Sequence, residues 1–181
     1  MEIERNYYLN KLITKKENHL IKIVTGIRRC GKSYLLDPIF KNYLLENGVD
    51  EKHIIKLELD SIENEEYTNP KKLYEYVINK VIDDKTYYII LDEIQKVDNF
   101  ESVLNSFLRK PNLDVYVTGS NSKFLSSDII TEFRGRGDEV RVYPLSFSEF
   151  MSVYDDNEVK GLDEYINYGG LPLITTFKTS E

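Results

Sequence analysis

The stretch Leu20–Ser33 reads LIKIVTGIRRCGKS and contains the pattern that decides the fold. Its first part, Leu20–Thr25, is rich in apolar and β-branched residues, which is typical of a buried strand. Its second part, Gly26–Ser33, fits G-x-x-x-x-G-K-[ST], a loop whose backbone N–H groups cradle phosphates. We expect Lys32 to reach the β- and γ-phosphates of a nucleotide and the Ser33 hydroxyl to bind Mg²⁺.

The nucleotide contacts are predicted to run through this loop into the helix that follows it. Glycine permits backbone conformations that a side chain would forbid, so the loop N–H groups can turn inward. At average residue frequencies, the four fixed positions coincide by chance in roughly one chain of this length in two hundred. The alternative is a Gly-rich turn with an exposed lysine, which the flanking strand and helix patterns disfavour. The predicted nucleotide-binding residues are Gly26, Ile27, Arg28, Arg29, Cys30, Gly31, Lys32, Ser33 and Tyr34.

The composition limits the class of protein. The chain has 181 residues, of which 41% are hydrophobic and 30% charged, as expected for one globular domain with a small appendage. The net charge of −7 argues against strong nucleic-acid binding by this chain and against attraction to an anionic membrane. The sequence shows no signal peptide and no apolar run near the ~18 residues of a membrane span. With a single cysteine, Cys30, no intramolecular disulfide can form, and we expect a cytoplasmic protein.

Strand and helix patterns alternate along the chain. Strands are expected over residues 20–25, 53–59, 86–91, 114–118 and 139–143. Helices are expected over residues 1–19, 33–46, 70–81, 100–109, 122–133, 147–153 and 162–168. Pro38 falls near the start of the second helix, where we expect it to cost less stability than it would further on, and Ser146 with Glu149 predicts a capping box. The alternation predicts parallel βαβ crossovers and an α/β fold with helices on both faces of the sheet.

Two acidic residues, Asp92 and Glu93, end the apolar strand at 86–91. Ligands of parallel sheets lie at the carboxyl ends of the strands, so we expect Asp92 to complete the Mg²⁺ shell beside Ser33. Glu93 is expected to orient or deprotonate an attacking water. The alternative, an acidic strand end that only caps the next helix, is disfavoured by the phosphate loop.

The acidic pair also discriminates among nucleotide-binding proteins. A kinase of small molecules has no need of a water-activating glutamate directly after the Mg²⁺ aspartate. A GTPase usually carries [NT]KxD for guanine, but Asn79-Lys80 is followed by Val81-Ile82 and the motif is absent from the sequence. ATP hydrolysis is therefore favoured.

Two further pairs of residues are candidates for the catalytic machinery. The fourth strand is followed by Ser120 and Asn121, either of which could sense the γ-phosphate, with a solvated turn as the open alternative. Arg134 or Arg136 could stabilise the transition state, in cis or from a neighbouring subunit. Surface arginines in salt bridges are the alternative. The catalytic candidates are thus Glu93, Asn121, Ser120 and Arg136.

Seven segments together resemble the N-terminal part of a prokaryotic AAA+-type P-loop ATPase family (AAA_14), whose members usually carry a C-terminal DUF4143 domain. They are RNYYLNKL at 5–12, GIRRCGKS at 26–33, IILDEIQ at 89–95, VYVTGSNSKFL at 115–125, FRGR at 133–136, YPLSFSEF at 143–150 and YGGLP at 168–172. The resemblance implies a P-loop NTPase three-layer αβα sandwich of the AAA+/ASCE type with a five-stranded, mainly parallel sheet. It also implies ATP and Mg²⁺, with Lys32 and Ser33 in the Walker A motif and Asp92 and Glu93 in the Walker B motif.

The resemblance further implies an ATPase core at residues 1–150 and the beginning of a truncated helical lid at 151–181. Members of the family are longer, so we expect the ATPase module of a longer protein, with an unknown protein partner and a homo-oligomeric full-length form. A nucleotide-gated interaction switch with little catalysis is one alternative, because an incomplete lid closes poorly over the nucleotide. An ATPase acting on nucleic acid is another, which the acidic net charge disfavours for this chain.

Overall fold

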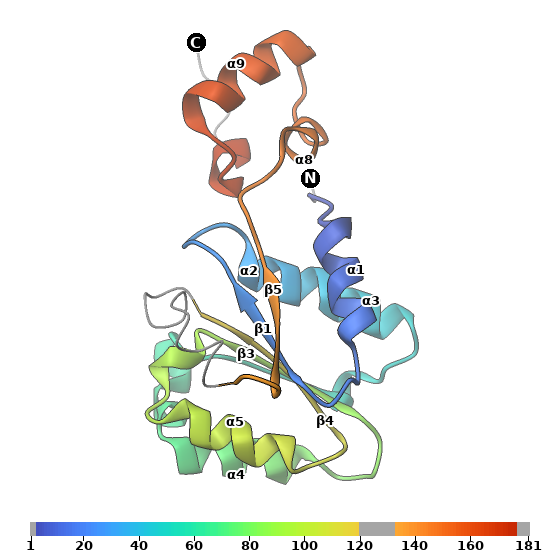
Figure 1. Cartoon of the computed structure of the whole chain (residues 1–181), viewed down its shortest axis with the longest axis vertical. Coiled ribbons are helices and arrows are strands. Elements are labelled where there is room, and N and C mark those ends of the chain that lie inside the picture. Colours follow the sequence, from blue (N-terminus) through green and yellow to red (C-terminus); the bar gives the residue numbers. More distant parts are fainter. Residues whose placement is uncertain (1–2, 120–132, 177–181) are drawn as a thin grey trace.

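A computed structural model describes residues 3–119 and 133–176 (Figure 1). Its sheet consists of β1 (Ile21–Thr25), β2 (Ile54–Glu58), β3 (Tyr87–Asp92), β4 (Leu113–Thr118) and β5 (Gly137–Arg141). The strand order is β2-β3-β4-β1-β5, and every neighbouring pair is parallel. Strand β4 lies between the acid strand β3 and the loop strand β1. The predicted α/β fold with a five-stranded parallel sheet is confirmed.

Helices cover both faces of this sheet (Figure 1). On one face lie α1 (Asn6–Lys15), α2 (Lys32–Tyr34), the π-helical η1 (Leu35–Phe40) and α3 (Lys41–Glu46). On the other lie α4 (Pro70–Lys80) and α5 (Phe100–Leu108). Side chains of β3 alternate between the two cores, with Ile89 and Leu91 facing α4 and α5 while Tyr88 and Ile90 face α1 and α3. Both faces of the central strands are therefore buried, as the apolar runs indicated.

The helix predicted over residues 33–46 is broken near its middle. Asp37 has extended backbone angles, φ −145° and ψ 114°, and the chain forms α2, η1 and α3 in place of one regular helix. Proline lacks an N–H and disfavours helical angles at the residue before it, so Pro38 forces Asp37 out of the helix. The prediction of one helix over residues 33–46 was therefore wrong.

Other helix boundaries follow from their capping residues. The predicted capping box is present at α8 (Phe147–Met151), where the Ser146 hydroxyl accepts from the Glu149 N–H at 3.3 Å and Glu149 accepts from the Ser146 N–H at 2.8 Å. Helix α9 (Glu158–Tyr168) begins earlier than predicted, because Asn157 caps it by accepting from the Lys160 N–H at 3.0 Å. The helix expected over 122–133 lies almost wholly outside the described residues.

Four short 3₁₀ helices complete the described chain: η2 (Glu51–His53), η3 (Ile62–Thr68), η4 (Ile94–Lys96) and η5 (Pro172–Thr176). Helices α8 and α9 lie beyond the end of the sheet at which β1 runs into α2 (Figure 1). They pack on each other through Phe150 and Tyr165, whose ring centroids are 5.5 Å apart. The division into a core at 1–150 and a lid beginning at 151 remains a prediction. Within residues 3–119 and 133–176, no helix combines the length and apolar character that a membrane span requires.

Candidate functional site

The phosphate-loop pattern lies at the carboxyl end of β1. Gly26 follows the strand with φ +148°, and a Cβ at this position would lie 2.3 Å from the Val142 carbonyl oxygen. Gly31 has φ +96° and directly precedes α2. Neither conformation suits an L side chain, so both fixed glycines of the motif are required by the backbone.

The Lys32 side chain is turned back over the loop. It is 5% exposed, and its Nζ donates to the carbonyl oxygens of Gly26 at 3.1 Å and Ile27 at 3.0 Å. The side chains of Ile27, Arg28 and Arg29, by contrast, are exposed. Among the loop residues that were predicted to bind the nucleotide, Lys32 is thus the one whose cationic side chain is directed into the loop.

The Cys30 thiol points away from the loop into the core. Its side chain is fully buried, and its Sγ donates to the Val142 carbonyl oxygen at 3.5 Å. Burial raises the pKa of this thiol, which disfavours the reactive thiolate. Cys30 can therefore meet a nucleotide through its backbone alone, whereas Tyr34, on α2, keeps 41% of its surface exposed.

Ser33 and Asp92 meet although 59 residues separate them in the sequence. The Ser33 hydroxyl donates to Asp92 Oδ1 at 3.0 Å, and the Thr118 hydroxyl, from the end of β4, donates to the same oxygen. Burial raises the pKa of the Asp92 carboxyl, and the nearby charges of Glu93 and Asp60 act in the same direction, while the two hydroxyls oppose the shift. The environment is therefore one in which a cation would stabilise the carboxylate.

Glu93 occupies a left-handed conformation, φ 56° and ψ 50°, directly after β3. Its N–H donates to the Thr118 hydroxyl oxygen at 2.9 Å, and its carboxylate accepts from Gln95 Nε2. Gln95 Oε1 is buried with no hydrogen-bond partner among the described residues. Thr118 and Gln95 were not predicted as site residues, although Thr118 directly precedes the Gly-Ser-Asn segment and Gln95 lies within IILDEIQ.

Arg136 is not brought to this site. The Ile21 N–H donates to its carbonyl oxygen at 2.9 Å, which places Arg136 at the opposite, amino end of β1 and β5. Its Nη1 donates to Asn105 Oδ1 at 2.6 Å. The five residues of β1 separate it from the phosphate loop, a span of about 16 Å. The same chain therefore does not supply Arg136 to its own loop in this structure, and a contribution from a neighbouring subunit stays a prediction.

The sensor candidates Ser120 and Asn121 lie outside the described residues. The structure thus brings together the loop, Ser33, Asp92 and Glu93, and adds Thr118 and Gln95. Arg134, two residues before Arg136, is exposed near the same amino end of β5.

The oxygen ligands present fit a magnesium–nucleotide complex. A serine hydroxyl and an aspartate carboxylate are hard ligands of the kind Mg²⁺ takes together with waters and substrate phosphates. In residues 3–119 and 133–176, no group of three or more His, Cys, Asp or Glu side chains could hold a metal by itself. Lys32, 5% exposed and bonded to loop carbonyls, can exchange these partners for phosphate oxygens.

Comparison with known sequences matches this chain to a protein family and to two longer relatives. A family model described as an AAA domain matches residues 18–151. An uncharacterized protein of Haemophilus influenzae is 33% identical over 178 residues, covering 95% of this chain and 44% of the relative. An uncharacterized protein of Methanocaldococcus jannaschii is 32% identical over 181 residues, covering 91% and 37% respectively. The chain thus spans less than half the length of these curated relatives.

Comparison with solved structures supports the same fold. A Walker-type ATPase of Pyrococcus abyssi superposes with a TM-score of 0.67 at 18% identity, covering 96% of this chain and 66% of the other. A DNA polymerase III gamma subunit-related protein of Thermotoga maritima gives 0.57 at 11% identity, with coverages of 83% and 49%. PCH-2 of C. elegans gives 0.55 at 15% identity, with coverages of 81% and 43%.

Proposed function

The chain belongs to the AAA domain family, and from this premise we propose that it binds ATP with Mg²⁺ and hydrolyses it as the ATPase module of a longer protein. One observation carries the proposal, namely the 3.0 Å hydrogen bond between Ser33 and Asp92. It joins the loop and the acidic strand end, which we assign as Walker A and Walker B motifs, at the carboxyl end of the sheet, where ligands of parallel α/β folds bind. The relatives' greater length supports the view that further domains use the ATPase.

The phosphates are bound by the loop between the two fixed glycines. Backbone N–H groups of residues 26–33 form the anion-binding cradle, and Lys32 leaves the two loop carbonyls to bind the β- and γ-phosphates. Ser33 and Asp92 would hold Mg²⁺, which when bound would neutralise charge on the phosphates. The missing guanine motif supports ATP over GTP.

The hydrolytic step is assigned to Glu93, which accepts a proton from, or orients, the water that attacks the γ-phosphate. Its backbone is held by Thr118 and its carboxylate by Gln95, so its orientation is set before the nucleotide binds. The buried Oε1 of Gln95, which has no hydrogen-bond partner in the described part of the chain, offers a second acceptor for that water. Ser120 or Asn121 is proposed as the γ-phosphate sensor.

We also propose that the full-length protein forms a homo-oligomer. Arg136 is exposed at the amino end of β5, remote from its own loop, as a residue acting on a neighbouring subunit would be. The proposed role of Arg136 in a neighbouring subunit does not affect whether a single chain binds ATP.

The assignment is tested with two variants of the motifs and two matched surface controls. We expect Lys32→Ala to weaken ATP binding by at least about 100-fold, because the ammonium is the loop's inward-facing cation. Glu93→Gln should keep Mg²⁺-dependent ATP binding and lose hydrolysis by about 100-fold or more. Titration calorimetry and phosphate release measure these quantities. Lys71→Ala and Glu75→Gln, exposed on α4, serve as controls and should behave as the unchanged chain.

Each outcome has a distinct meaning. Normal turnover by the Glu93→Gln variant would remove the catalytic role of Glu93. Tight ATP binding by the unchanged chain with hydrolysis at background would favour the nucleotide-gated switch. Absence of any nucleotide binding would overturn the proposed function.

A further inference from the structure

The Arg5 side chain joins segments that are remote in the sequence. Arg5 directly precedes α1 and is only 3% exposed. Its Nη1 donates to the carbonyl oxygen of Cys30, inside the phosphate loop, at 3.2 Å. Its Nη2 donates to the carbonyl oxygen of Tyr143, beyond β5, at 2.7 Å. A buried guanidinium thus bonds directly to the backbone of the loop.

The same guanidinium is held on its remaining sides. Its Nε lies 3.0 Å from Glu149 Oε1 in an ion pair that does not have hydrogen-bond geometry, and the other oxygen of Glu149 accepts from the Ser146 N–H in the capping box of α8. The guanidinium also stacks 4.6 Å above the centre of the Tyr8 ring, and the Tyr8 hydroxyl accepts from the Tyr143 N–H at 3.1 Å. A fork of fixed donors fits this arrangement, which a single ammonium could not reproduce.

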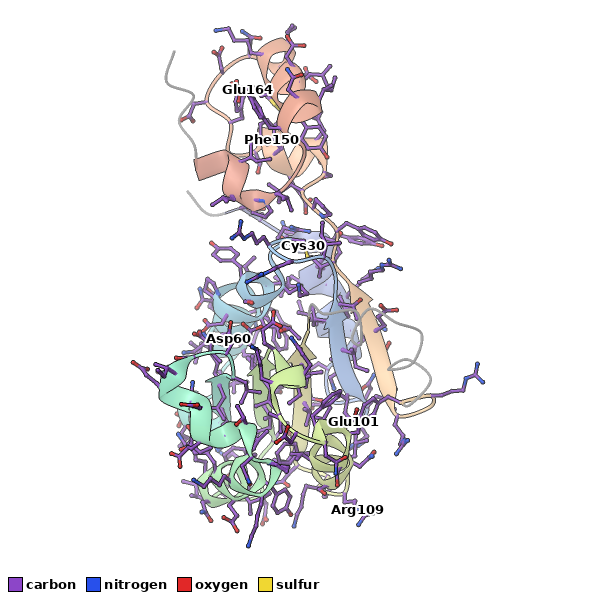
Figure 2. The ribbon with its side chains drawn as sticks, turned by 90° about the vertical axis from the view of Figure 1, so that its left-hand side faces the viewer. Cys30, Asp60, Glu101, Arg109, Phe150 and Glu164 are labelled. Carbon is purple, nitrogen blue, oxygen red and sulfur yellow. The ribbon has the colours of Figure 1, made fainter. Side chains whose placement is uncertain are left out.

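This cluster lies where the core meets the C-terminal helices. Figure 2 shows Cys30 at the junction between the sheet domain and the segment that carries Phe150. Figure 1 shows the N-terminal end of the described chain beside α8. A Cβ built on Gly31 would lie 3.7 Å from both Arg5 Nη1 and Pro172 Cγ, so the loop is approached by both segments at this point.

The contact with Cys30 fixes the direction of the next N–H group. In a trans peptide the C=O and N–H bonds point in opposite directions. Because Arg5 holds the Cys30 carbonyl toward itself, the Gly31 N–H points to the other side of the loop. Gly31, with φ +96°, also has an unusually free backbone that could rotate this peptide if the contact were missing.

We propose that Arg5 is a positioning residue that fixes the Cys30–Gly31 peptide so that the Gly31 N–H faces the phosphate cradle, and that Glu149 fixes Arg5 in turn. The inference rests on the proposed function, since it assigns a role within the same nucleotide site. The inference predicts that Arg5 affects binding of the β-phosphate and not of the rest of the nucleotide. ADP, whose β-phosphate enters the cradle, depends on Arg5, whereas AMP, which lacks that phosphate, does not.

The test measures dissociation constants of Mg²⁺–ADP and of AMP by titration calorimetry at a temperature where circular dichroism shows every variant folded. Arg5→Met should weaken ADP binding by about 10- to 30-fold and leave AMP binding within about twofold, as expected for lost hydrogen bonds around a charged ligand. Arg5→Lys should lose nearly as much, because it keeps the charge and loses the fork. Glu149→Gln, which leaves Arg5 in place, should lose about threefold.

Lys22→Met is the matched control, because Lys22 is a buried cation on the same domain at the opposite end of β1. It should lower thermal stability without changing the ratio of the ADP and AMP dissociation constants. If Arg5→Met does not fold, Arg5→Lys and Glu149→Gln carry the test. Unchanged ADP binding in the folded Arg5 variants, or equal losses for ADP and AMP, would overturn the inference while the proposed function stands. Failure of the unchanged chain to bind ADP would overturn both.

Discussion

Each end of the sheet buries a group of polar side chains, and the two groups differ in how they are completed. At the amino end, the fully buried Lys22 forms an ion pair with Asp114 and also donates to the Leu20 carbonyl oxygen and to Asn18 Oδ1. Asp114 in turn accepts from the Glu17 N–H and the Tyr116 hydroxyl. All three donors of the ammonium and both oxygens of the carboxylate are satisfied within the chain.

At the carboxyl end, charges of opposite sign are kept apart. Asp92 accepts from two hydroxyls, Ser33 and Thr118, and no Lys or Arg of the described chain forms an ion pair with it. Lys32 bonds to two neutral carbonyls of the loop. The carboxylate is suited to a cation and the ammonium to an anion, and the proposed ligand, Mg²⁺–ATP, would supply both.

The comparison teaches that a buried polar cluster indicates a ligand site only when its charges are not balanced internally. The amino-end cluster joins the segment that follows α1 to β1 and β4, which is a structural role. Within the described residues, the charges of the carboxyl-end cluster are not balanced by each other, which fits the proposed nucleotide site. Variants at the two ends should therefore affect different measurements.

The largest effect is expected at the amino end. Lys22→Met leaves Asp114 buried without its cation, which should cost about 3–5 kcal/mol of unfolding free energy. Chemical denaturation measures the loss. The double variant Lys22→Met/Asp114→Leu should recover much of it, because no charge then remains buried. A fall in nucleotide affinity in the folded Lys22→Met protein would contradict the prediction that the polar clusters at the two ends of the sheet act independently.

A smaller effect is expected at Thr118, at the carboxyl end of β4. Thr118→Val keeps the shape of the side chain but removes its hydrogen bonds to Asp92 and to the Glu93 N–H. We expect ATP turnover to fall by about tenfold, equivalent to about 1.4 kcal/mol, with ATP affinity changed by less than about threefold. Steady-state hydrolysis and ATP titration separate these quantities. Full turnover in the variant would show that Thr118 does not orient Glu93.

The smallest effect is expected on the free energy of unfolding at high pH, and it arises from Tyr88, near the amino end of β3. Burial, with a hydrogen bond to Glu17, raises the pKa of Tyr88 to about 12 from an ordinary value of 10.0. The unfolded chain therefore loses this proton first, so the contribution of Tyr88 is complete below pH 10 and is lost as the pH rises toward 12. The two-unit shift corresponds to about 2.7 kcal/mol, which solvent screening around the partly solvated Tyr88 hydroxyl reduces to about 1 kcal/mol. It is measured by comparing denaturation of the unchanged chain and Tyr88→Phe across this range, and equal slopes would contradict it.

Local patterns in the sequence predicted most elements because they depend on neighbouring residues. The Gly26–Ser33 loop, the five strands and the Ser146–Glu149 capping box follow from backbone sterics and side-chain periodicity. The same approach failed at Pro38, where the restriction on the preceding residue proved stronger than the apolar helical pattern. It also missed the start of α9, because the Asn157 cap was interpreted as part of a polar connection.

The site could be predicted in part. Lys32, Ser33, Asp92 and Glu93 lie in short motifs with a known mechanism, so their chemistry could be inferred in advance. Thr118 and Gln95 lie in segments that carry the family resemblance, but a threonine at a strand end and a glutamine after an acidic pair have no chemistry of their own to mark them, so neither was predicted. Their roles depend on the neighbouring strand and on side-chain direction, which the local sequence does not encode.

The sequence by itself determined that this protein has a phosphate loop after a buried strand, a second strand that ends in two acids, and helices between them. Only the tertiary structure decided that β4 separates those strands, that Ser33 contacts Asp92, and that Lys22 is balanced by Asp114 while Lys32 bonds to neutral loop carbonyls. It also decided that Arg5 contacts the phosphate loop and that Arg136 does not. The physical reason is range, since turns and periodicities arise between near neighbours, whereas charge balance depends on residues that meet only after the chain has folded.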